Sequence, residues 1–101
     1  MDFFMGISIS TSVRQKLATK HSVTENEVIE CFSSRKANAK FLKDNREEHK
    51  TNPPSLWFIG TTDTGRVLKV VFIYCSDSNE FVIKTAYEAN GEEVRIYSKY
   101  S

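Results

Sequence analysis

The chain has 101 residues, of which 14 are Lys or Arg and 13 are Asp or Glu, giving a formal net charge of +1. This length predicts a single domain spanning residues 1–101, and the near-neutral charge excludes a dedicated nucleic-acid coat protein, which would be strongly basic. Hydrophobic residues make up 40% of the chain and charged residues 27%, which excludes an intrinsically disordered protein and indicates a soluble globular one.

The N-terminal part predicts a short strand and a short helix. Residues 3–9, FFMGISI, are typical of a strand or arm. In residues 12–20, SVRQKLATK, Val13 and Leu17 lie four positions apart, which predicts a helix with Lys in its last turn. The opening MDFFMGISIS has an acid and no base, which is not the pattern of a signal peptide. The longest apolar run, residues 70–75, is too short to span a membrane. We therefore expect a cytoplasmic protein with no membrane contact.

A complete helix-start signal follows at Thr24. Thr24 as N-cap and Glu27 three residues later form a capping box, in which each side chain accepts a hydrogen bond from the other residue's backbone amide. Val23 and Val28 stand at the two positions of a hydrophobic staple, which fixes the angle at which the chain enters the helix. Together these signals predict a second helix over residues 24 to about 34.

The second half of the chain predicts strands. Residues 55–61 (SLWFIGT), 66–74 (RVLKVVFIY) and 80–87 (EFVIKTAY) are rich in β-branched and aromatic side chains, and the turns TDTG and CSDSN separate them. They predict an antiparallel meander whose middle strand is central, because apolar residues occupy both of its faces. Residues 40–44, KFLKD, could add a short fourth strand. Within the middle strand, we expect Lys69 to have a half-buried stem and a solvated head.

A third helix is predicted at the C-terminus. Asn90 as N-cap and Glu93 as its partner form a second capping box, and Val94 and Tyr97 lie on one face of the helix that follows. The element order predicts an α+β domain in which two N-terminal helices pack on an antiparallel three- to four-stranded sheet and a C-terminal helix follows. We expect the helices to cover one face of that sheet.

The cysteine and histidine pattern indicates neither a metal site nor a cofactor site. Cys31 and Cys75 are far apart and match no CxxC motif, so both are interpreted as small core residues. Their spacing relative to His21 and His49 fits no ligand pattern either. The sequence therefore predicts no metal and no cofactor.

A run of basic residues lies between the second helix and the first long strand. Five basic residues fall within twelve positions and only Asp44 offsets them. Such a run is usually solvated surface, but it is also a candidate face for an anionic ligand, and both interpretations stay open here. The five are Arg35, Lys36, Lys40, Lys43 and Arg46.

Three segments, taken in order, carry a family resemblance. They are KHSVTENEVIECF at residues 20–32, GRVLKVVFI at residues 65–73 and VIKTAYEANGEEVRIY at residues 82–97. They resemble the helix entry, the Gly-Arg-x-Leu-x-Val-Val strand and the C-terminal strand with its acid-rich helix in the BrnT toxin family of type II toxin–antitoxin systems. Where that family usually has a basic residue after the strand-end Ala, this sequence has Tyr87.

The resemblance implies a RelE-like fold and a metal-independent ribonuclease that cleaves RNA by attack of the 2′-hydroxyl. In such enzymes Lys and Arg stabilise the phosphate charge, while a Tyr, His or Glu moves protons. The resemblance also implies a small antitoxin of the ribbon-helix-helix type encoded by a neighbouring gene. The sequence argues against an ADP-ribosyl hydrolase of the dinitrogen-reductase type, because those enzymes are larger, helical and dependent on a carboxylate-bound metal pair.

A second hypothesis is a catalytically weak RelE-like module that binds protein or RNA. The near-neutral charge and Tyr87 favour this module, whereas the order of the three segments favours the toxin. Whether the chain forms a homodimer stays open.

Lys20-His21 is a candidate site at the end of the first predicted helix. The pair could serve only to cap helix carbonyls, or it could contact RNA. Histidine is the side chain whose ordinary pKa lies closest to neutral pH, which suits proton transfer. Arg66 begins the central strand beside a glycine turn and is either an edge charge or an active-site cation. We predict that the His21 ring and Arg66 lie on the same side of the domain.

Lys84 and Tyr87 end the third long strand. Strict alternation would place Lys84 and Ala86 on one face of the sheet, and Tyr87 and Ile83 on the other. Either Lys84 or Tyr87 should therefore face the helix-free side of the sheet. The resemblance and these placements together give the full set of candidates. Catalytic roles are predicted for His21, Arg66, Lys84 and Tyr87, and RNA contacts for Lys20, Arg35, Lys36, Lys40 and Lys43.

Overall fold

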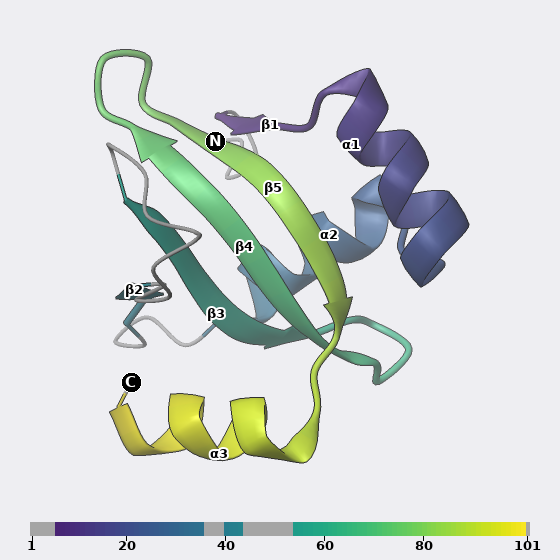
Figure 1. Ribbon diagram of the computed structural model, residues 1–101, viewed down its shortest axis with the longest axis vertical. Coiled ribbons are helices and arrows are strands. Elements are labelled where there is room, and N and C mark those ends of the chain that lie inside the picture. The colour runs from purple at the N-terminus through teal and green to yellow at the C-terminus, as the bar shows by residue number, and fades with distance from the viewer. Residues whose placement is uncertain (1–5, 36–39, 44–53, 101) are drawn as a thin grey trace.

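The computed structural model describes residues 6–35, 40–43 and 54–100, and these form an α+β domain (Figure 1). Its elements in chain order are β1 (Ile7–Ser8), α1 (Thr11–Lys16), the π-helical turn η1 (Leu17–His21), α2 (Glu25–Ser34), β2 (Leu42–Lys43), β3 (Ser55–Thr61), β4 (Val67–Cys75), β5 (Glu80–Glu88) and α3 (Gly91–Tyr100). None of the helices in these described stretches is long and apolar enough to cross a membrane.

The five strands form one sheet in the order β1-β5-β4-β3-β2. The β3, β4 and β5 strands are the predicted antiparallel meander, and β4 is its central strand, as expected. The short β2 pairs with β3 in antiparallel orientation and is the fourth strand that residues 40–44 were expected to add. The prediction of an antiparallel sheet of three to four strands is wrong in one respect, because β1 pairs with β5 in parallel and makes the sheet mixed and five-stranded. A parallel neighbour arises here because β1 and β5 are joined by a long crossover rather than by a hairpin.

The two N-terminal helices begin where the sequence predicts. Ser10 caps α1 by accepting a hydrogen bond from the Val13 amide at 3.2 Å. Thr24 and Glu27 form the predicted capping box of α2, with N···O distances of 3.0 and 3.2 Å. These side chains satisfy amides that the first turn of a helix would otherwise leave without partners.

One face of the sheet and the two N-terminal helices enclose the core. The α2 helix packs against β3 so closely that a Cβ added to Gly60 would lie 2.6 Å from the Cβ of Cys31. Phe58 and Phe72 point into the same layer and are fully buried. Phe32 of α2 meets both rings edge-to-face, at centroid distances of 4.7 and 5.8 Å. Aromatic pairs in this geometry stabilise a core beyond the area that they bury.

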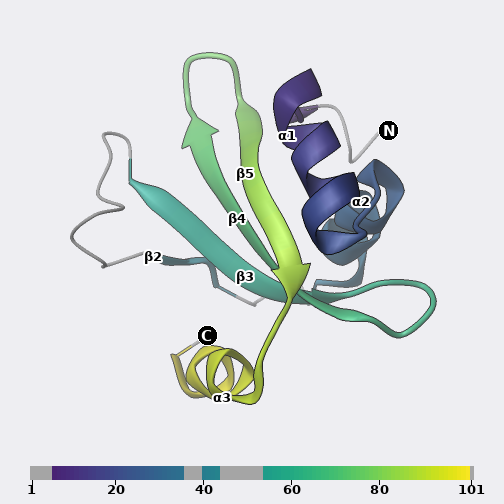
Figure 2. The same cartoon turned by 45° about the vertical axis from the view of Figure 1, so that its right-hand side comes forward.

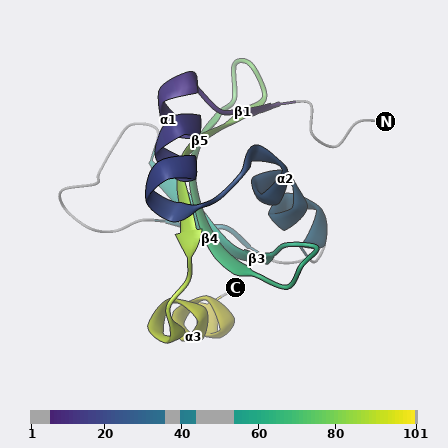
Figure 3. The ribbon, with the colours of Figure 1, turned by 90° about the vertical axis from the view of Figure 1, so that its right-hand side faces the viewer.

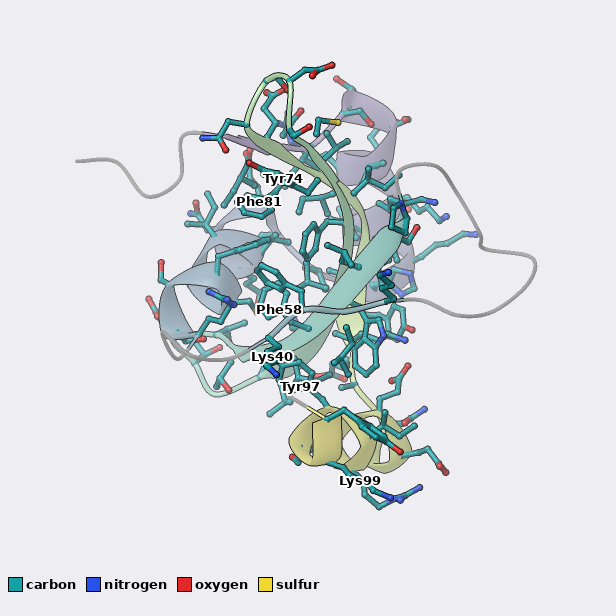
Figure 4. The ribbon with its side chains drawn as sticks, turned by 90° about the vertical axis from the view of Figure 1, so that its left-hand side faces the viewer. Lys40, Phe58, Tyr74, Phe81, Tyr97 and Lys99 are labelled. Atoms are coloured by element: carbon teal, nitrogen blue, oxygen red, sulfur yellow. The ribbon has the colours of Figure 1, made fainter. Side chains whose placement is uncertain are left out.

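The C-terminal helix lies against the other face of the sheet, which corrects the prediction that all helices share one face. Figure 2 shows α3 beneath the lower end of the sheet, away from α1 and α2. Its Tyr97 ring lies 5.8 Å from that of Trp57, and Trp57 alternates along β3 with the core residue Phe58. Tyr97 also donates a hydrogen bond to the Lys40 carbonyl at 2.8 Å, and Figure 4 shows it on the inner side of α3 with Lys99 on the outer side.

A β-bulge in β5 changes which of its residues face the core. The register of β4 and β5 shifts between Val71 and Phe72, so Lys84 stands between two paired positions. An extra residue of this kind reverses the alternation of faces beyond it. Ile83 and Ala86 therefore both point into the core, with exposures of 1% and 0%. The prediction that Ala86 shares a face with Lys84 and Ile83 with Tyr87 is wrong, because it assumed an unbroken period of two.

Candidate functional site

A π-helical turn brings His21 to a corner of the fold. The η1 turn ends at His21, and the φ of 53° and ψ of 42° of the next residue, Ser22, lie in the left-handed region. The Val23 amide donates to the Leu17 carbonyl at 3.0 Å. A π-helical turn is rare and is often found at functional sites. A left-handed residue other than glycine also costs free energy, so neighbouring groups must stabilise the turn.

Arg66 stabilises this corner through its guanidinium group. Its Nη1 donates to the Ser22 carbonyl at 2.8 Å, and its Nη2 lies 3.4 Å from the His21 carbonyl oxygen. The same Nη1 lies 3.0 and 2.9 Å from the two carboxylate oxygens of Glu27, and Nε donates to Glu88 at 3.3 Å. Arg66 is thus close to His21, as predicted, but it meets the backbone of His21 and not its ring.

The ion pair between Arg66 and Glu27 favours the charged form of both groups. The hydrogen bond to Glu27 raises the pKa of Arg66. Partial burial alone would raise the pKa of Glu27, but hydrogen bonds from the Thr24 amide and from Arg66 outweigh burial and hold that pKa below its ordinary value. The pair therefore joins the N-terminus of α2 to the β3–β4 turn.

The His21 ring faces Tyr87 across the edge of the sheet. The two ring centroids are 5.6 Å apart and the planes are tilted by 44°. In Figure 3 the end of the first helix lies beside the end of β5. Together with Lys20 and Glu88, His21 and Tyr87 line an open hollow of about 490 Å³, which we call the His21 hollow. An imidazole and an ammonium from the end of the first helix thus share one surface depression with a phenol from the end of β5.

Behind Tyr87 lies a second group of polar contacts, which we call the Glu93 cluster: Lys69, Tyr87, Glu93 and Trp57. One Glu93 oxygen, Oε2, accepts from Lys69 Nζ at 3.1 Å and from the Tyr87 hydroxyl at 3.0 Å. The Lys69 ammonium also lies 4.5 Å from the centre of the Trp57 ring. The Lys69 side chain is 10% exposed, so the prediction that its head is solvated is wrong.

Burial raises one pKa value in the Glu93 cluster, and hydrogen bonds lower another. Burial raises the pKa of Tyr87, Lys69 partly opposes this, and the Glu93 carboxylate adds to it. Burial also tends to raise the pKa of Glu93, but hydrogen bonds from the Asn90 amide and from Lys69 outweigh it and lower the pKa. Tyr87 is therefore held as a protonated phenol and Glu93 as a carboxylate.

The whole region is electrically balanced. Three cations and three carboxylates meet around His21 and Tyr87, so their formal charges sum to zero. They are Lys20, Arg66 and Lys69 with Glu27, Glu88 and Glu93. Sequence reasoning found Arg66 and Lys20 but missed the three carboxylates. The available signal was the capping-box position of Glu27 and Glu93, since a capping carboxylate has a second oxygen that can bind a cation.

The other candidate residues that the structure describes are not among those that line the His21 hollow. Lys84 stands three residues before Tyr87 in the bulge of β5, which places it about 10 Å along the strand. Lys40 and Lys43 are exposed on the β2 side of the sheet, and β2 is separated from β5 by three strand spacings, or about 14 Å. Arg35 ends α2, with its guanidinium 4.2 Å from the Phe41 ring centre. Lys36 falls outside the described residues.

The described side chains also bear on nucleophilic and metal chemistry. Burial raises the pKa of the Cys31 thiol to about 12, so it is not a thiolate nucleophile at neutral pH. Within residues 6–35, 40–43 and 54–100, no three His, Cys, Asp or Glu side chains are grouped so that they could hold a metal ion.

Comparison of the chain with models of known protein families gives no match, and comparison with curated protein sequences gives none either.

Proposed function

We propose that the chain is a RelE-like ribonuclease toxin that cleaves RNA at the His21 hollow. The observation that carries this proposal is the contact between the His21 and Tyr87 rings, whose centroids are 5.6 Å apart. Lys20 lines the same hollow. The arrangement of two N-terminal helices on one face of a mostly antiparallel sheet supports it, because the resemblance to the BrnT family implies that arrangement.

The proposed reaction is a metal-independent transesterification within the RNA strand. His21 accepts the proton of the ribose 2′-hydroxyl, whose oxygen attacks the adjacent phosphorus. The bond from phosphorus to the 5′-oxygen breaks, and this oxygen takes the proton of the Tyr87 phenol. Lys20 stabilises the charge that develops on the phosphate oxygens. The products are a 2′,3′-cyclic phosphate and a 5′-hydroxyl. The raised pKa of Tyr87 is consistent with a phenol that stays protonated until the leaving group needs it.

In this proposal Arg66 is a positioning residue. Its guanidinium binds Glu27, Glu88 and backbone carbonyls, and it supports the turn that presents the His21 ring. The predicted role of Lys84 in catalysis stays a prediction.

The proposal is tested by cleavage of free and ribosome-bound RNA with matched variants. His21→Gln, Tyr87→Phe and Lys20→Ala should each reduce the cleavage rate at least tenfold while leaving the circular dichroism spectrum unchanged. The controls are Tyr100→Phe, at a tyrosine that is 60% exposed on α3, and Lys16→Ala, at an exposed lysine one turn before Lys20. Equal losses in the test and control variants would contradict the assignment of the site.

The proposed partners are RNA and an antitoxin encoded by a neighbouring gene, expected to be a small ribbon-helix-helix protein, and the proposed location is the cytoplasm. The antitoxin should cover the site through a large interface, as in obligate complexes. Co-expression with the neighbouring reading frame should yield a complex that co-purifies. High-yield expression of the chain alone without a growth defect would count against the toxin.

The balanced charge around the site favours a second candidate, a catalytically weak module that binds protein or RNA. Arg66 and Lys69 each pair with carboxylates. Among the three cations described above, Lys20, which lines the hollow, is the one with no described carboxylate contact. Wild-type protein that binds RNA without cleaving it would support this module and contradict the enzyme.

A further inference from the structure

The two oxygens of the Glu93 carboxylate do different things. Oε1 accepts the Asn90 amide at 3.0 Å and completes the capping box of α3. Oε2 lies between Lys69 Nζ at 3.1 Å and the Tyr87 hydroxyl at 3.0 Å. The capping box needs only the first contact. The second contact puts an anionic oxygen between an ammonium and a phenol on the surface of the sheet.

The Lys69 and Tyr87 groups have the properties of an anion subsite. An ammonium and a hydroxyl that converge on one oxygen form charge-assisted hydrogen bonds, which are the contacts that hold a phosphate oxygen. The Trp57 ring lies under the ammonium at 4.5 Å and restricts its position. Tyr87 also contacts His21, so the subsite adjoins the His21 hollow.

None of the ten residues of α3, the helix that carries Glu93, is buried. Elements with few buried apolar contacts open at low free-energy cost. The contacts that hold the helix include Tyr97 on Trp57, the Tyr97 hydrogen bond to the Lys40 carbonyl, and the ion pair of Glu93 with Lys69.

We propose that Lys69 and Tyr87 form a phosphate subsite for RNA, and that the Glu93 carboxylate occupies it in the free protein as an internal competitor. This inference rests on the proposed function, since it assigns the subsite to the phosphodiester that is cleaved, and the Tyr87 hydroxyl that binds this phosphate is the group that protonates its 5′-oxygen. A phosphate and Glu93 cannot use the same two donors at once, so ligand binding must displace Glu93. Removing the Glu93 charge changes the local sum from zero to +1, which favours an anion.

The test uses the intrinsic fluorescence of Trp57, because it is the only tryptophan in the chain. Uridine 5′-monophosphate is titrated into wild-type protein, Glu93→Gln and the matched control Glu92→Gln. Glutamine keeps the capping-box geometry and removes only the charge. Glu92 lies one residue earlier on the same helix, is 67% exposed and pairs with Arg95, so its substitution makes the same net-charge change away from the subsite.

The expected result is at least tenfold tighter binding of uridine 5′-monophosphate to Glu93→Gln than to wild type, and a change of less than twofold for Glu92→Gln. The double variant Lys69→Met/Glu93→Gln should lose this gain. Inorganic phosphate should bind with the same rank order across the variants, whereas uridine alone should not distinguish them. Equal affinities for Glu93→Gln and Glu92→Gln would overturn the inference.

A ligand-dependent melting temperature covers the case in which Glu93→Gln is less stable. A ligand that binds only the folded state raises the melting temperature, so uridine 5′-monophosphate should stabilise Glu93→Gln more than wild type. Equal rises in melting temperature for Glu93→Gln, Glu92→Gln and wild type at the same ligand concentration would overturn the inference. The binding result is separate from catalysis. Tighter binding by Glu93→Gln without cleavage by wild type would sustain the subsite and reject the ribonuclease, and cleavage without that gain would do the reverse.

Discussion

Replacing Arg66 with Ala should destabilise the fold far more than the same replacement of an arginine whose ion pair is exposed on the surface. Arg66 and Glu27 have side-chain exposures of 25% and 17%, and Nη1 lies within 3.0 Å of both Glu27 oxygens and at 2.8 Å from the Ser22 carbonyl. Hydrogen bonds to charged groups contribute about 1.5–3 kcal/mol each when buried. Partial exposure and the Glu88 contact, whose carboxylate is 67% exposed, reduce the total. We expect a loss of about 2–3 kcal/mol in the free energy of unfolding.

Urea unfolding followed by circular dichroism measures this loss. Thermal unfolding should show the same loss. For a domain of this size a change of 1 kcal/mol moves the melting temperature by about 4–8 °C, so the melting temperature of Arg66→Ala should fall by at least about 8 °C. Arg14→Ala is the matched control, because Arg14 and Glu25 form a pair at 3.3 Å with exposures of 52% and 45%. Such exposed pairs contribute about 0–1 kcal/mol. A double-mutant cycle with Glu27→Gln should show coupling of about 1 kcal/mol or more. If Arg66→Ala lowers the free energy of unfolding no more than Arg14→Ala does, Arg66 does not stabilise the turn at His21.

Three further predictions concern packing, thiol chemistry and acid stability. Gly60→Ala should lower the free energy of unfolding by about 1–3 kcal/mol, because the added Cβ would lie 2.6 Å from Cys31 Cβ, and an unchanged urea midpoint would contradict that packing. A thiol reagent at pH 8 should label the partly exposed Cys75 and spare the buried Cys31, whose pKa is about 12; equal labelling rates would be incompatible with the fold. Glu27 and Glu93 have pKa values below ordinary in the folded state, so the unfolded chain takes up protons first as pH falls. Their stabilising contribution should be complete above about pH 4.5 and lost below it, and unfolding measured from pH 6 to 3 should be less pH-dependent in Glu27→Gln than in wild type.

Local sequence signals predicted most of the elements because those signals act over a few residues. The capping boxes at Thr24 and Asn90 each combine a short side chain with a Glu three positions later, and both are present. The meander followed from apolar strands and short turns, including Gly65, whose φ is 93°. These signals depend only on residues that lie close together in the sequence.

The errors arose where distant parts of the chain decide the outcome. Nothing in the sequence near Lys84 announces a bulge, which depends on how β5 pairs with β4. The placement of α3 depends on Trp57 and Lys69, which stand at outward positions of β3 and β4 and bind Tyr97 and Glu93.

The candidate site was predicted in part. The sequence suggested that His21, Arg66 and Tyr87 come together, and the structure has them within one region. Charge counting along the chain could not find that Arg66 is bound by Glu27 and Glu88, since those residues are 39 and 22 positions away. Local clustering also favoured Lys40 and Lys43, which lie at or beside β2, the edge strand three strand positions away from β5.

Cleavage of one RNA and its chemically blocked analogue tests the central claim most directly. Purified wild-type protein is incubated in the presence of a chelator with a single-stranded RNA and with the same sequence carrying 2′-O-methyl groups. The account predicts 2′,3′-cyclic phosphate ends from the RNA, no cleavage of the blocked strand, and at least tenfold slower release by His21→Gln. Cleavage of the 2′-O-methyl strand, or wild-type protein inert toward both free and ribosome-bound RNA, would contradict it.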